Sequence, residues 1–241
     1  MRKAVVTGCN RGIGLAITKR LLKDDYEVYG TYRSITQELE GLQKLKNFKS
    51  FKLELDRSDS IDRLIEEVIT PEKPDVLVNN AGMAQRKPFL SLTATDWQIM
   101  FETNFFSAVR LCQAVLPFMV EKRSGRVINI VSIGGQWGGI HQVHYAAAKA
   151  SLINLTKSLA KLFSRENVTV NAIAPGSIDT EMIQGEIPTD PELKKNFFKT
   201  IPAGRLGKPS EIADLVGFLV SDQAGYITGQ TIGINGGVYF E

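Results

Sequence analysis

The segment Thr7-Gly8-Cys9-Asn10-Arg11-Gly12-Ile13-Gly14 decides the fold, because it separates a short apolar run from a segment of helical periodicity. The glycines allow a tight turn between a strand and a helix, and they let the backbone approach a pyrophosphate at the helix N-terminus. A glycine cluster alone is weak evidence, since any tight turn can use glycine. Its place after an expected strand and before an expected helix favours a dinucleotide-binding turn over a purely structural one.

The same alternation continues along the chain. We expect strands at residues 4–7, 28–32, 51–55, 76–79, 127–131, 168–174 and 231–234, and helices at 14–22, 36–45, 61–69, 95–121, 145–163 and 210–221. Short apolar runs between helical segments are typical of βαβ units. The pattern predicts an α/β protein with a Rossmann-type, three-layer, doubly wound fold and a seven-stranded parallel sheet, in a single domain over residues 1–241.

Residues 181–200 interrupt this alternation just after an expected strand. The segment contains Pro188, Pro191 and Phe197-Phe198 among several charges. Because ligands in open α/β sheets bind outside the carboxyl ends of the strands, we expect a substrate lid here. A solvated surface excursion is the alternative.

Charge and composition argue against several functional classes. The net charge is +3, and the chain contains no run of five like charges, so a nucleic-acid-binding arm is not indicated. Cys9 and Cys112 lack metal-ligand spacing, and two free thiols are typical of a reducing compartment, so we expect a cytoplasmic protein. We expect no secretory signal and no membrane span, because no run of about 18 apolar residues is present.

The end of the second expected strand indicates which dinucleotide binds. The stretch Val28-Tyr29-Gly30-Thr31-Tyr32-Arg33-Ser34 lacks the carboxylate that an NAD site usually offers to the ribose hydroxyls. Arg33 and Arg11 would supply positive charge to a 2′-phosphate, whose oxygens suit guanidinium geometry. The sequence therefore favours NADP(H) over NAD(H). An ordinary surface charge is the alternative role for Arg33.

Tyr145 and Lys149 form the candidate proton-transfer pair. They are four residues apart at the start of an expected helix, so their side chains share one helical face. A phenol with a pKa near 10 is a poor acid or base at neutral pH, but a neighbouring cation favours the phenolate. Ser132, at the end of an expected strand, would add a hydroxyl that holds a substrate oxygen. Alone, each of these residues could be an ordinary surface or turn residue.

Together these motifs closely resemble those of the short-chain dehydrogenase/reductase family. The resemblance spans essentially the whole chain, in order and spacing. It is carried by Thr7-Gly8 with Gly12 and Gly14, Asn79-Asn80-Ala81-Gly82, Asn104, Ser132, Tyr145 with Lys149, and Pro175-Gly176.

The resemblance implies a role for each matching residue. Ser132 positions the substrate oxygen, Tyr145 exchanges the proton, and Lys149 binds the nicotinamide ribose and lowers the tyrosine pKa. Asn104 holds a water in a proton relay. Gln142, which precedes Tyr145 closely, is a candidate substrate contact. The implied cofactor contacts are Gly8, Asn10, Arg11, Gly12, Ile13, Gly14, Arg33, Asp56, Asn80, Ala81, Gly82, Tyr145, Lys149, Pro175, Gly176, Ile178 and Thr180.

Within the family, the chain is most similar to the β-ketoacyl-ACP reductases. The similarity lies in residues 144–150, 201–207 and 226–237. It implies NADPH-dependent reduction of a 3-oxoacyl thioester in fatty-acid synthesis, with Arg123 and Arg165 near the active-site mouth engaging acyl carrier protein. Surface arginines for solubility are the alternative. The stretch Met83-Ala84-Gln85-Arg86-Lys87-Pro88 departs from the threonine-arginine-aspartate pattern of that group.

Other functions stay open at this point. The same scaffold reduces sugars, steroids, diketones or acetoacetyl-CoA in other family members, and fold alone does not choose among them. A non-catalytic NADP-binding protein and an NAD-dependent dehydrogenase are further alternatives. His141 and His144 lack suitable partners for a metal site, so we expect no metal. The family resemblance also implies a homotetramer.

Overall fold

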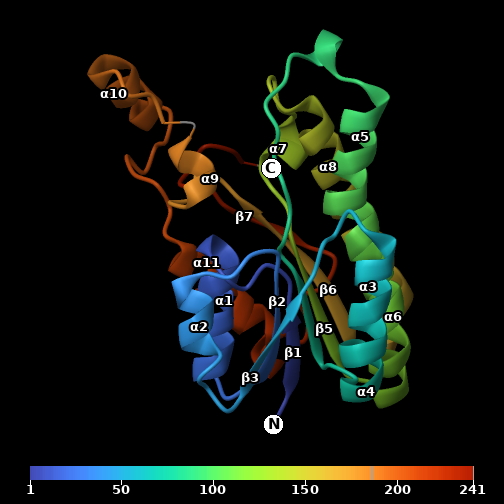
Figure 1. Ribbon diagram of the computed structural model, residues 1–241. Helices are drawn as coiled ribbons and strands as arrows, with labels where there is room; N and C mark the ends of the chain where they lie inside the picture. The colour runs from blue at the N-terminus through green and yellow to red at the C-terminus, as the bar shows by residue number, and fades with distance from the viewer. Residues whose placement is uncertain (186, 241) are drawn as a thin grey trace.

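Seven parallel strands form one sheet in the order β3-β2-β1-β4-β5-β6-β7 (Figure 1). The computed structural model describes residues 1–185 and 187–240. The strands are β1 Lys3–Val6, β2 Glu27–Tyr32, β3 Phe48–Lys52, β4 Val76–Asn79, β5 Gly125–Ile130, β6 Val168–Pro175 and β7 Thr231–Ile234. This topology confirms the predicted Rossmann-type sheet. Strand order reverses between β1 and β4, so the chain leaves a crevice at the carboxyl ends of these two strands.

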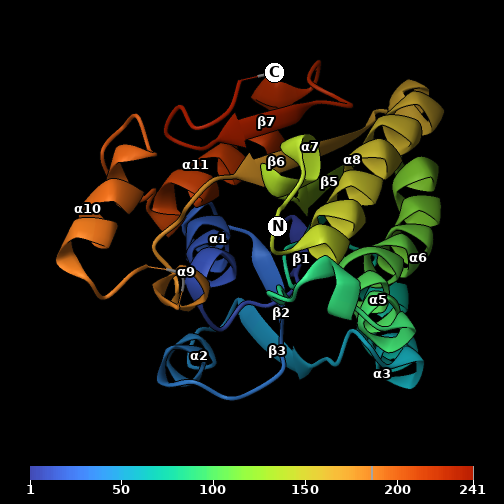
Figure 2. The same cartoon turned by 90° about the horizontal axis from the view of Figure 1, so that it is seen from above.

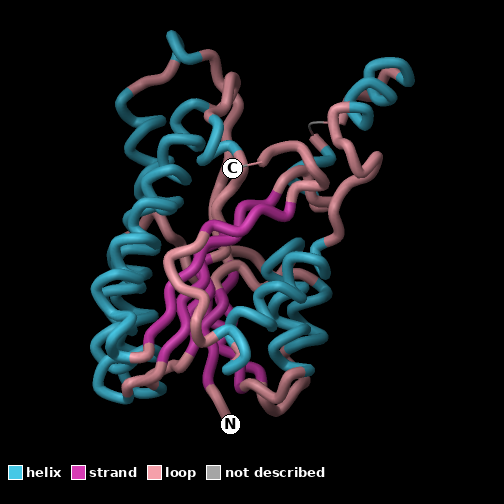
Figure 3. Tube along the Cα trace, turned by 180° about the vertical axis from the view of Figure 1, so that it is seen from behind, coloured by secondary structure: helices cyan, strands magenta, loops and turns pink. Residues whose placement is uncertain are grey.

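The described residues form eleven α-helices, several of which cover the two faces of the sheet. They are α1 Gly12–Lys23, α2 Gln37–Leu42, α3 Ser58–Leu64, α4 Thr70–Glu72, α5 Ala94–Phe101, α6 Ser107–Lys122, α7 Gly134–Trp137, α8 Val143–Phe163, α9 Glu181–Gln184, α10 Pro191–Lys199 and α11 Pro209–Val220. Helices α1, α2 and α11 lie on one face, and α3, α6 and α8 lie on the other (Figure 2). The view from behind shows the strands enclosed between these two helical layers (Figure 3).

Strand residues alternate between two hydrophobic cores. In β1, Ala4 and Val6 pack with Ile17 and Val216 beneath α1 and α11, whereas Val5 packs in the core on the opposite face. Because both faces of the sheet are covered, the inner strands are buried along their whole length and mostly apolar, with buried polar side chains such as Asn129 and Asn171 among them. The sheet therefore forms a rigid base whose carboxyl edge carries loops.

A single long helical stretch, Ala94–Lys122, lies beside the sheet. It comprises α5, a π-helical turn at Glu102–Phe106, and α6. Its length and composition would allow it to cross a membrane, but in this fold Leu111, Val115 and Met119 are buried in the core. A capping box between Thr93 and Asp96 fixes the N-terminus of α5.

The predicted lid region contains helices that the sequence analysis left unassigned. Helix α9 begins at Glu181, and α10 begins at Pro191, where the Asp190 carboxylate accepts hydrogen bonds from two backbone N–H groups. Neither helix has a buried residue, and α10 projects away from the body of the protein (Figure 1). Residue 186, which is part of the expected lid, lies outside the described residues.

Candidate active site

A cleft of about 860 Å³ runs along the carboxyl ends of the strands, where open α/β sheets bind ligands. The predicted cofactor residues line it, with the exception of Gly14. Those residues are Gly8, Asn10, Arg11, Gly12, Ile13, Arg33, Asp56, Asn80, Ala81, Gly82, Tyr145, Lys149, Pro175, Gly176, Ile178 and Thr180. Asn104, Ser132 and Gln142, the remaining predicted site residues, line the same cleft. The fold thus gathers residues between Gly8 and Ile183, far apart in the sequence, around one space.

The glycine-rich turn has the geometry of a phosphate cradle. Gly8 and Gly12 have φ angles of +72° and +52°, which side-chain-bearing residues rarely adopt. Gly14 does not line the cleft but lies beneath the turn. A Cβ at this position would come within 2.0 Å of the Gly8 carbonyl oxygen and 2.4 Å of Asn80 Nδ2. Gly14 therefore lets α1 pack close to the turn. The exposed backbone N–H groups at the N-terminus of α1 suit a pyrophosphate.

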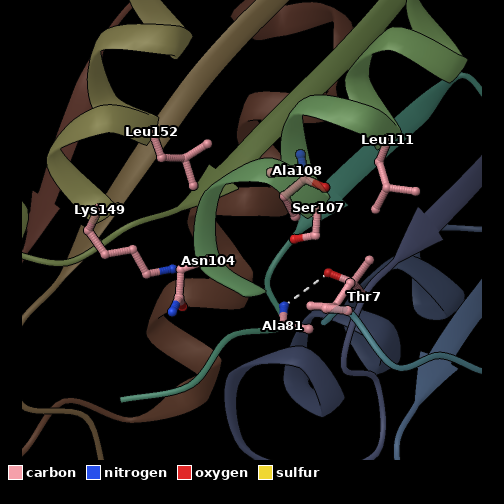
Figure 4. A pocket seen from close by; sticks show the side chains of 10 residues that line it. Thr7, Ala81, Asn104, Ser107, Ala108, Leu111, Lys149 and Leu152 are labelled. Atoms are coloured by element: carbon pink, nitrogen blue, oxygen red, sulfur yellow. Dashed lines mark hydrogen bonds between the residues drawn. The ribbon is translucent and has the colours of Figure 1, made fainter. Parts of the chain in front are cut away.

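Thr7 links the two strands that border the crevice. Its hydroxyl oxygen accepts a hydrogen bond from the backbone N–H of Ala81 at 2.9 Å (Figure 4). It accepts a second one from the backbone N–H of Asn80, also at 2.9 Å. In return, Asn80 Nδ2 donates to the Thr7 carbonyl oxygen at 2.8 Å. These bonds fix the turn after β1 and the turn after β4 relative to each other. The two sides of the cleft therefore keep one spacing.

Arg11 and Arg33 lie at the same end of the cleft, beyond β1 and β2. The Arg11 guanidinium is paired with the Glu181 carboxylate at the start of α9, at 2.7 Å, and both side chains are exposed. Asn10 Nδ2 donates to the Ser34 carbonyl oxygen at 2.8 Å, which ties the glycine-rich turn to the end of β2. This end of the cleft is thus cationic and suits an anionic group such as a phosphate.

Lys149 is buried beside Tyr145, with 4% of its surface exposed. Its Nζ donates to the Ile130 carbonyl oxygen at 2.9 Å and lies 5.8 Å from the centroid of the Tyr145 ring. Burial lowers the pKa of Lys149 to about 8, because a charged ammonium is poorly solvated there. Ser132 lies opposite, and its hydroxyl oxygen accepts a hydrogen bond from Gly134 N at 3.1 Å.

Asn104 lies in the π-helical turn and holds the segment that follows Gly82. Its Oδ1 accepts from Met83 N at 3.2 Å, and its Nδ2 donates to the Met83 and Met100 carbonyl oxygens at 3.0 and 3.1 Å. A π-helical turn widens the helix locally and is frequent at functional sites. Asn104 and Lys149 both line a small cavity of about 10 Å³, together with eight other residues such as Thr7 and Ser107, and this volume is at the lower limit for one water molecule (Figure 4).

The sequence did not predict a buried chain of polar side chains that begins at Asn79, nor two further residues that line the cleft. Asn79 Nδ2 donates to Asn129 Oδ1 at 2.9 Å, and Asn129 Nδ2 donates to Thr156 Oγ1 at 2.9 Å, which joins β4, β5 and α8. Asn79 and Asn129 are register partners, so their pairing would have followed from aligning the two expected strands. Trp137 and Met182 line the cleft as well. They lie in α7 and α9, which have no periodicity long enough to recognise.

The structure corrects the expected position of Arg123 and Arg165. Arg123 and Arg165 do lie together, with Arg123 Nη2 donating to the Arg165 carbonyl oxygen at 3.1 Å, but they are not at the mouth of this cleft. They precede β5 and β6, whereas Ser132 follows β5, so roughly 20 Å of strand separates the two ends of the sheet.

Among the described residues, no group of three or more His, Cys, Asp or Glu could hold a metal ion.

Comparisons with known proteins agree on one family. A family profile described as enoyl-(acyl carrier protein) reductase matches residues 8–239. The 3-oxoacyl-[acyl-carrier-protein] reductase FabG of Vibrio cholerae is 41% identical over 239 residues, which cover 98% of this chain and 96% of the relative. FabG of Escherichia coli K12 is 39% identical over 242 residues, with the same coverage. FabG of Haemophilus influenzae is 41% identical over 239 residues, covering 98% and 97%.

Proposed function

Because the chain belongs to the short-chain dehydrogenase/reductase family, we propose that it reduces the ketone of a 3-oxoacyl thioester to a secondary alcohol with NADPH, in fatty-acid synthesis. The observation that carries this proposal is the meeting of Ser132, Tyr145 and Lys149 in the cleft that also contains the glycine-rich turn. The names of full-length relatives near 40% identity support the choice of a 3-oxoacyl thioester. Family membership supports a nicotinamide dinucleotide as the cofactor.

The cradle fits such a cofactor, whose nicotinamide ring, when bound, supplies the hydride that reduces the ketone carbon. Ser132 Oγ holds the ketone oxygen, which fixes the reacting carbon for attack. The Tyr145 hydroxyl donates its proton to that oxygen as the negative charge develops, so the product is an alcohol. Both residues are in reach of one substrate because β5 ends, and α8 begins, at the same edge of the sheet.

Lys149 and Asn104 complete the proton path in this proposal. The Lys149 ammonium stabilises the tyrosinate that remains after proton transfer, because it is held beside the ring with little water to screen it. The small cavity that Asn104 and Lys149 help to line can hold one water, through which a proton returns towards Tyr145. Asn104 keeps this cavity in place by holding the backbone of Met83.

The preference for NADPH over NADH rests on Arg11 and Arg33 at the cationic end of the cleft. A 2′-phosphate there would replace the weak, exposed pairing between Arg11 and Glu181 with charge-assisted hydrogen bonds to two guanidinium groups. NADH carries a neutral hydroxyl in place of this phosphate, so it gains no such charge-assisted bonds.

The thioester is proposed to arrive on acyl carrier protein. Arg123 and Arg165 lie at the opposite edge of the sheet from this cleft, so they would contact a carrier only beside the cleft of a neighbouring copy. We propose a homotetramer on the same basis. Its support is the exposed apolar surface of Ile99, Phe106 and Leu162 along the outer helices, with 40, 45 and 68% of these residues exposed.

The test is an NADPH-oxidation screen over acetoacetyl thioesters on carrier protein and on CoA, small diketones and keto-sugars. We expect the acetoacetyl thioesters to turn over fastest, with the lower KM for the carrier-linked one. Tyr145→Phe keeps the ring but removes the proton, so kcat should fall by about 10²- to 10⁴-fold. Robust activity on another carbonyl without turnover of acetoacetyl thioesters would overturn the substrate assignment. A Phe variant as fast as the parent would overturn the mechanism.

A further inference from the structure

The first turn of α8 carries Tyr145 but lacks an ordinary helix cap. The N-cap residue is Gln142, and its side chain makes no capping hydrogen bond. The first backbone N–H groups of a helix have no partner within the helix, so an uncapped first turn frays easily. A tyrosine that must meet a substrate oxygen within a fraction of an ångström needs another restraint.

His144 provides one such restraint, on the side of α8 that faces away from the cleft. Its imidazole is completely buried, and its Nε2 lies 2.8 Å from Gln85 Oε1. The other amide atom, Gln85 Nε2, donates to Asp96 Oδ1 at 3.2 Å. Because an ionised carboxylate only accepts hydrogen bonds, the amide nitrogen faces Asp96 and the amide oxygen faces the histidine. His144 Nε2 therefore carries the hydrogen and donates it to Gln85.

A second tether joins the same two segments. The backbone N–H of Lys87 donates to the His141 carbonyl oxygen at 3.0 Å, just before α8. The Lys87 ammonium is paired with Asp96 Oδ2 at 2.6 Å, so Asp96 at the N-terminus of α5 holds both Gln85 and Lys87. The Trp97 ring and the imidazole pack in a T-shaped arrangement, with the ring centroids 6.0 Å apart. The start of α8 is thus fixed to α5 through residues 85–87.

We propose that His144 is a positioning residue for Tyr145, acting as a neutral imidazole whose Nε2–H bond to Gln85 fixes the first turn of α8. The proposal rests on the proposed proton transfer by Tyr145. It also gives a role to residues 83–88, the stretch in which this chain departs from the pattern of the carrier-protein reductases. In place of that pattern, Gln85 and Lys87 join the tyrosine-bearing helix to α5.

The environment of His144 favours the neutral ring. Its Nδ1 is buried and has no hydrogen-bond partner among the described residues, so a proton added there would find no acceptor. Burial lowers the pKa of His144 below its ordinary value of 6.5. Asp96 on α5 opposes this shift, and Lys87 on the neighbouring segment reinforces it. The N-terminal end of the α8 dipole also disfavours a cation at this position.

Two matched variants separate the hydrogen bond from packing. His144→Phe retains a ring against Trp97 but has no donor, whereas His144→Gln retains an N–H donor. We expect kcat to fall about tenfold or more in the Phe variant and to stay within about threefold of the parent in the Gln variant. The Kd for NADPH should hardly change in either, because the glycine-rich turn is untouched. Equal loss of kcat in both variants, or none in the Phe variant, would overturn the proposal.

Selective ¹⁵N labelling of histidine gives a readout that needs no substrate. The chain contains two histidines, so His144→Gln assigns both signals. We expect His144 to show an Nε2–H tautomer that persists below pH 6.5 and is perturbed by Gln85→Leu. An Nδ1–H tautomer or no response to Gln85→Leu would contradict the proposal. If thioesters are not the substrate, the kinetic comparison is made on whichever carbonyl turns over, so failure of the two proposals remains distinguishable.

Discussion

Burying the Lys149 ammonium destabilises the folded protein, whereas the proposed reaction needs that charge beside Tyr145. Its ammonium is buried with one backbone carbonyl as a hydrogen-bond acceptor, and burial lowers its pKa to about 8 from 10.5. The folded protein therefore binds fewer protons than the unfolded chain between about pH 8 and 10.5, and stability from this group rises with pH through that window. Below about pH 8 both states are protonated, and the cost of burying the charge is fully present.

Lys149→Met is expected to stabilise the cofactor-free protein while abolishing activity. At about 1.4 kcal/mol per pKa unit, the gain at pH 7 should be about 3 kcal/mol, as an upper bound. The gain should shrink between about pH 8 and 10.5 as the lysine of the parent loses its proton. Urea unfolding of parent and variant across this range measures the difference, in which the contributions of all other titrating groups cancel. A constant difference across the window would show that the charge of Lys149 carries no cost.

The same residue illustrates what the sequence could reveal of the site. Ser132, Tyr145 and Lys149 were predicted because each follows a local rule, either the end of an apolar run or a spacing of four on a helix. His144 was considered only as a metal ligand and set aside, and its actual partner, Gln85, lies 59 residues away in a loop. A side-chain bond between a loop and a helix has no periodicity, so only the fold reveals it.

Among elements, the strands and long helices were predicted well and their ends less so. β4 and β7 have the predicted bounds, but β3 spans Phe48–Lys52, three residues earlier than expected. The alternation of Leu53 and Leu55 continues past the strand, yet pairing ends with Lys52 because β2 ends at its partner Tyr32. The expected helix at residues 95–121 contains a π-helical turn at Glu102–Phe106, for which the sequence offered no sign.

The ion pair between Arg11 and Glu181 joins α1 to α9 and competes with the proposed 2′-phosphate for the same cation. Glu181→Gln should therefore tighten NADPH binding a few-fold, in keeping with the modest strength of an exposed pair, and leave NADH binding unchanged. The effect should weaken as salt is raised, because both side chains are exposed. Calorimetric titration of the two cofactors measures it.

Arg11→Gln is the matched control for this prediction. It should weaken NADPH binding and spare NADH, and adding Glu181→Gln to it should change nothing further, because the competitor then has no cation to hold. If Glu181→Gln shifts the affinity for both cofactors equally, the ion pair acts on the fold of α9 and not on the phosphate.

At the scale of the whole molecule, the two cysteines lie in the hydrophobic cores on opposite faces of the sheet, so labelling their thiols can measure how each core opens. Cys9 is buried in the core beneath α1 and α11, and Cys112 is buried in the core on the opposite face of the sheet. Burial raises the pKa of each thiol to about 12, so neither is a thiolate near neutral pH. Because one sheet separates and supports both cores, we expect them to open together.

Cys9→Ala and Cys112→Ala leave one thiol each for labelling with a disulfide reagent. In the native protein, we expect both remaining thiols to react only as fast as the protein unfolds globally, and NADPH to slow both by the same factor. Labelling at several urea concentrations gives the two opening free energies. Much faster labelling of Cys9 than of Cys112 would instead show that the glycine-rich turn opens on its own.

Helices α9 and α10 have no buried residue, and this has an evolutionary consequence. Substitutions on such a surface usually change the free energy of unfolding by about 0.5 kcal/mol or less, so residues there can be replaced at little risk to folding. Yet Met182 and Ile183 in α9 border the cleft. Descendants of this chain could therefore change substrate by altering this segment alone, while keeping the proposed cofactor-binding turn and the proposed proton-transfer residues intact.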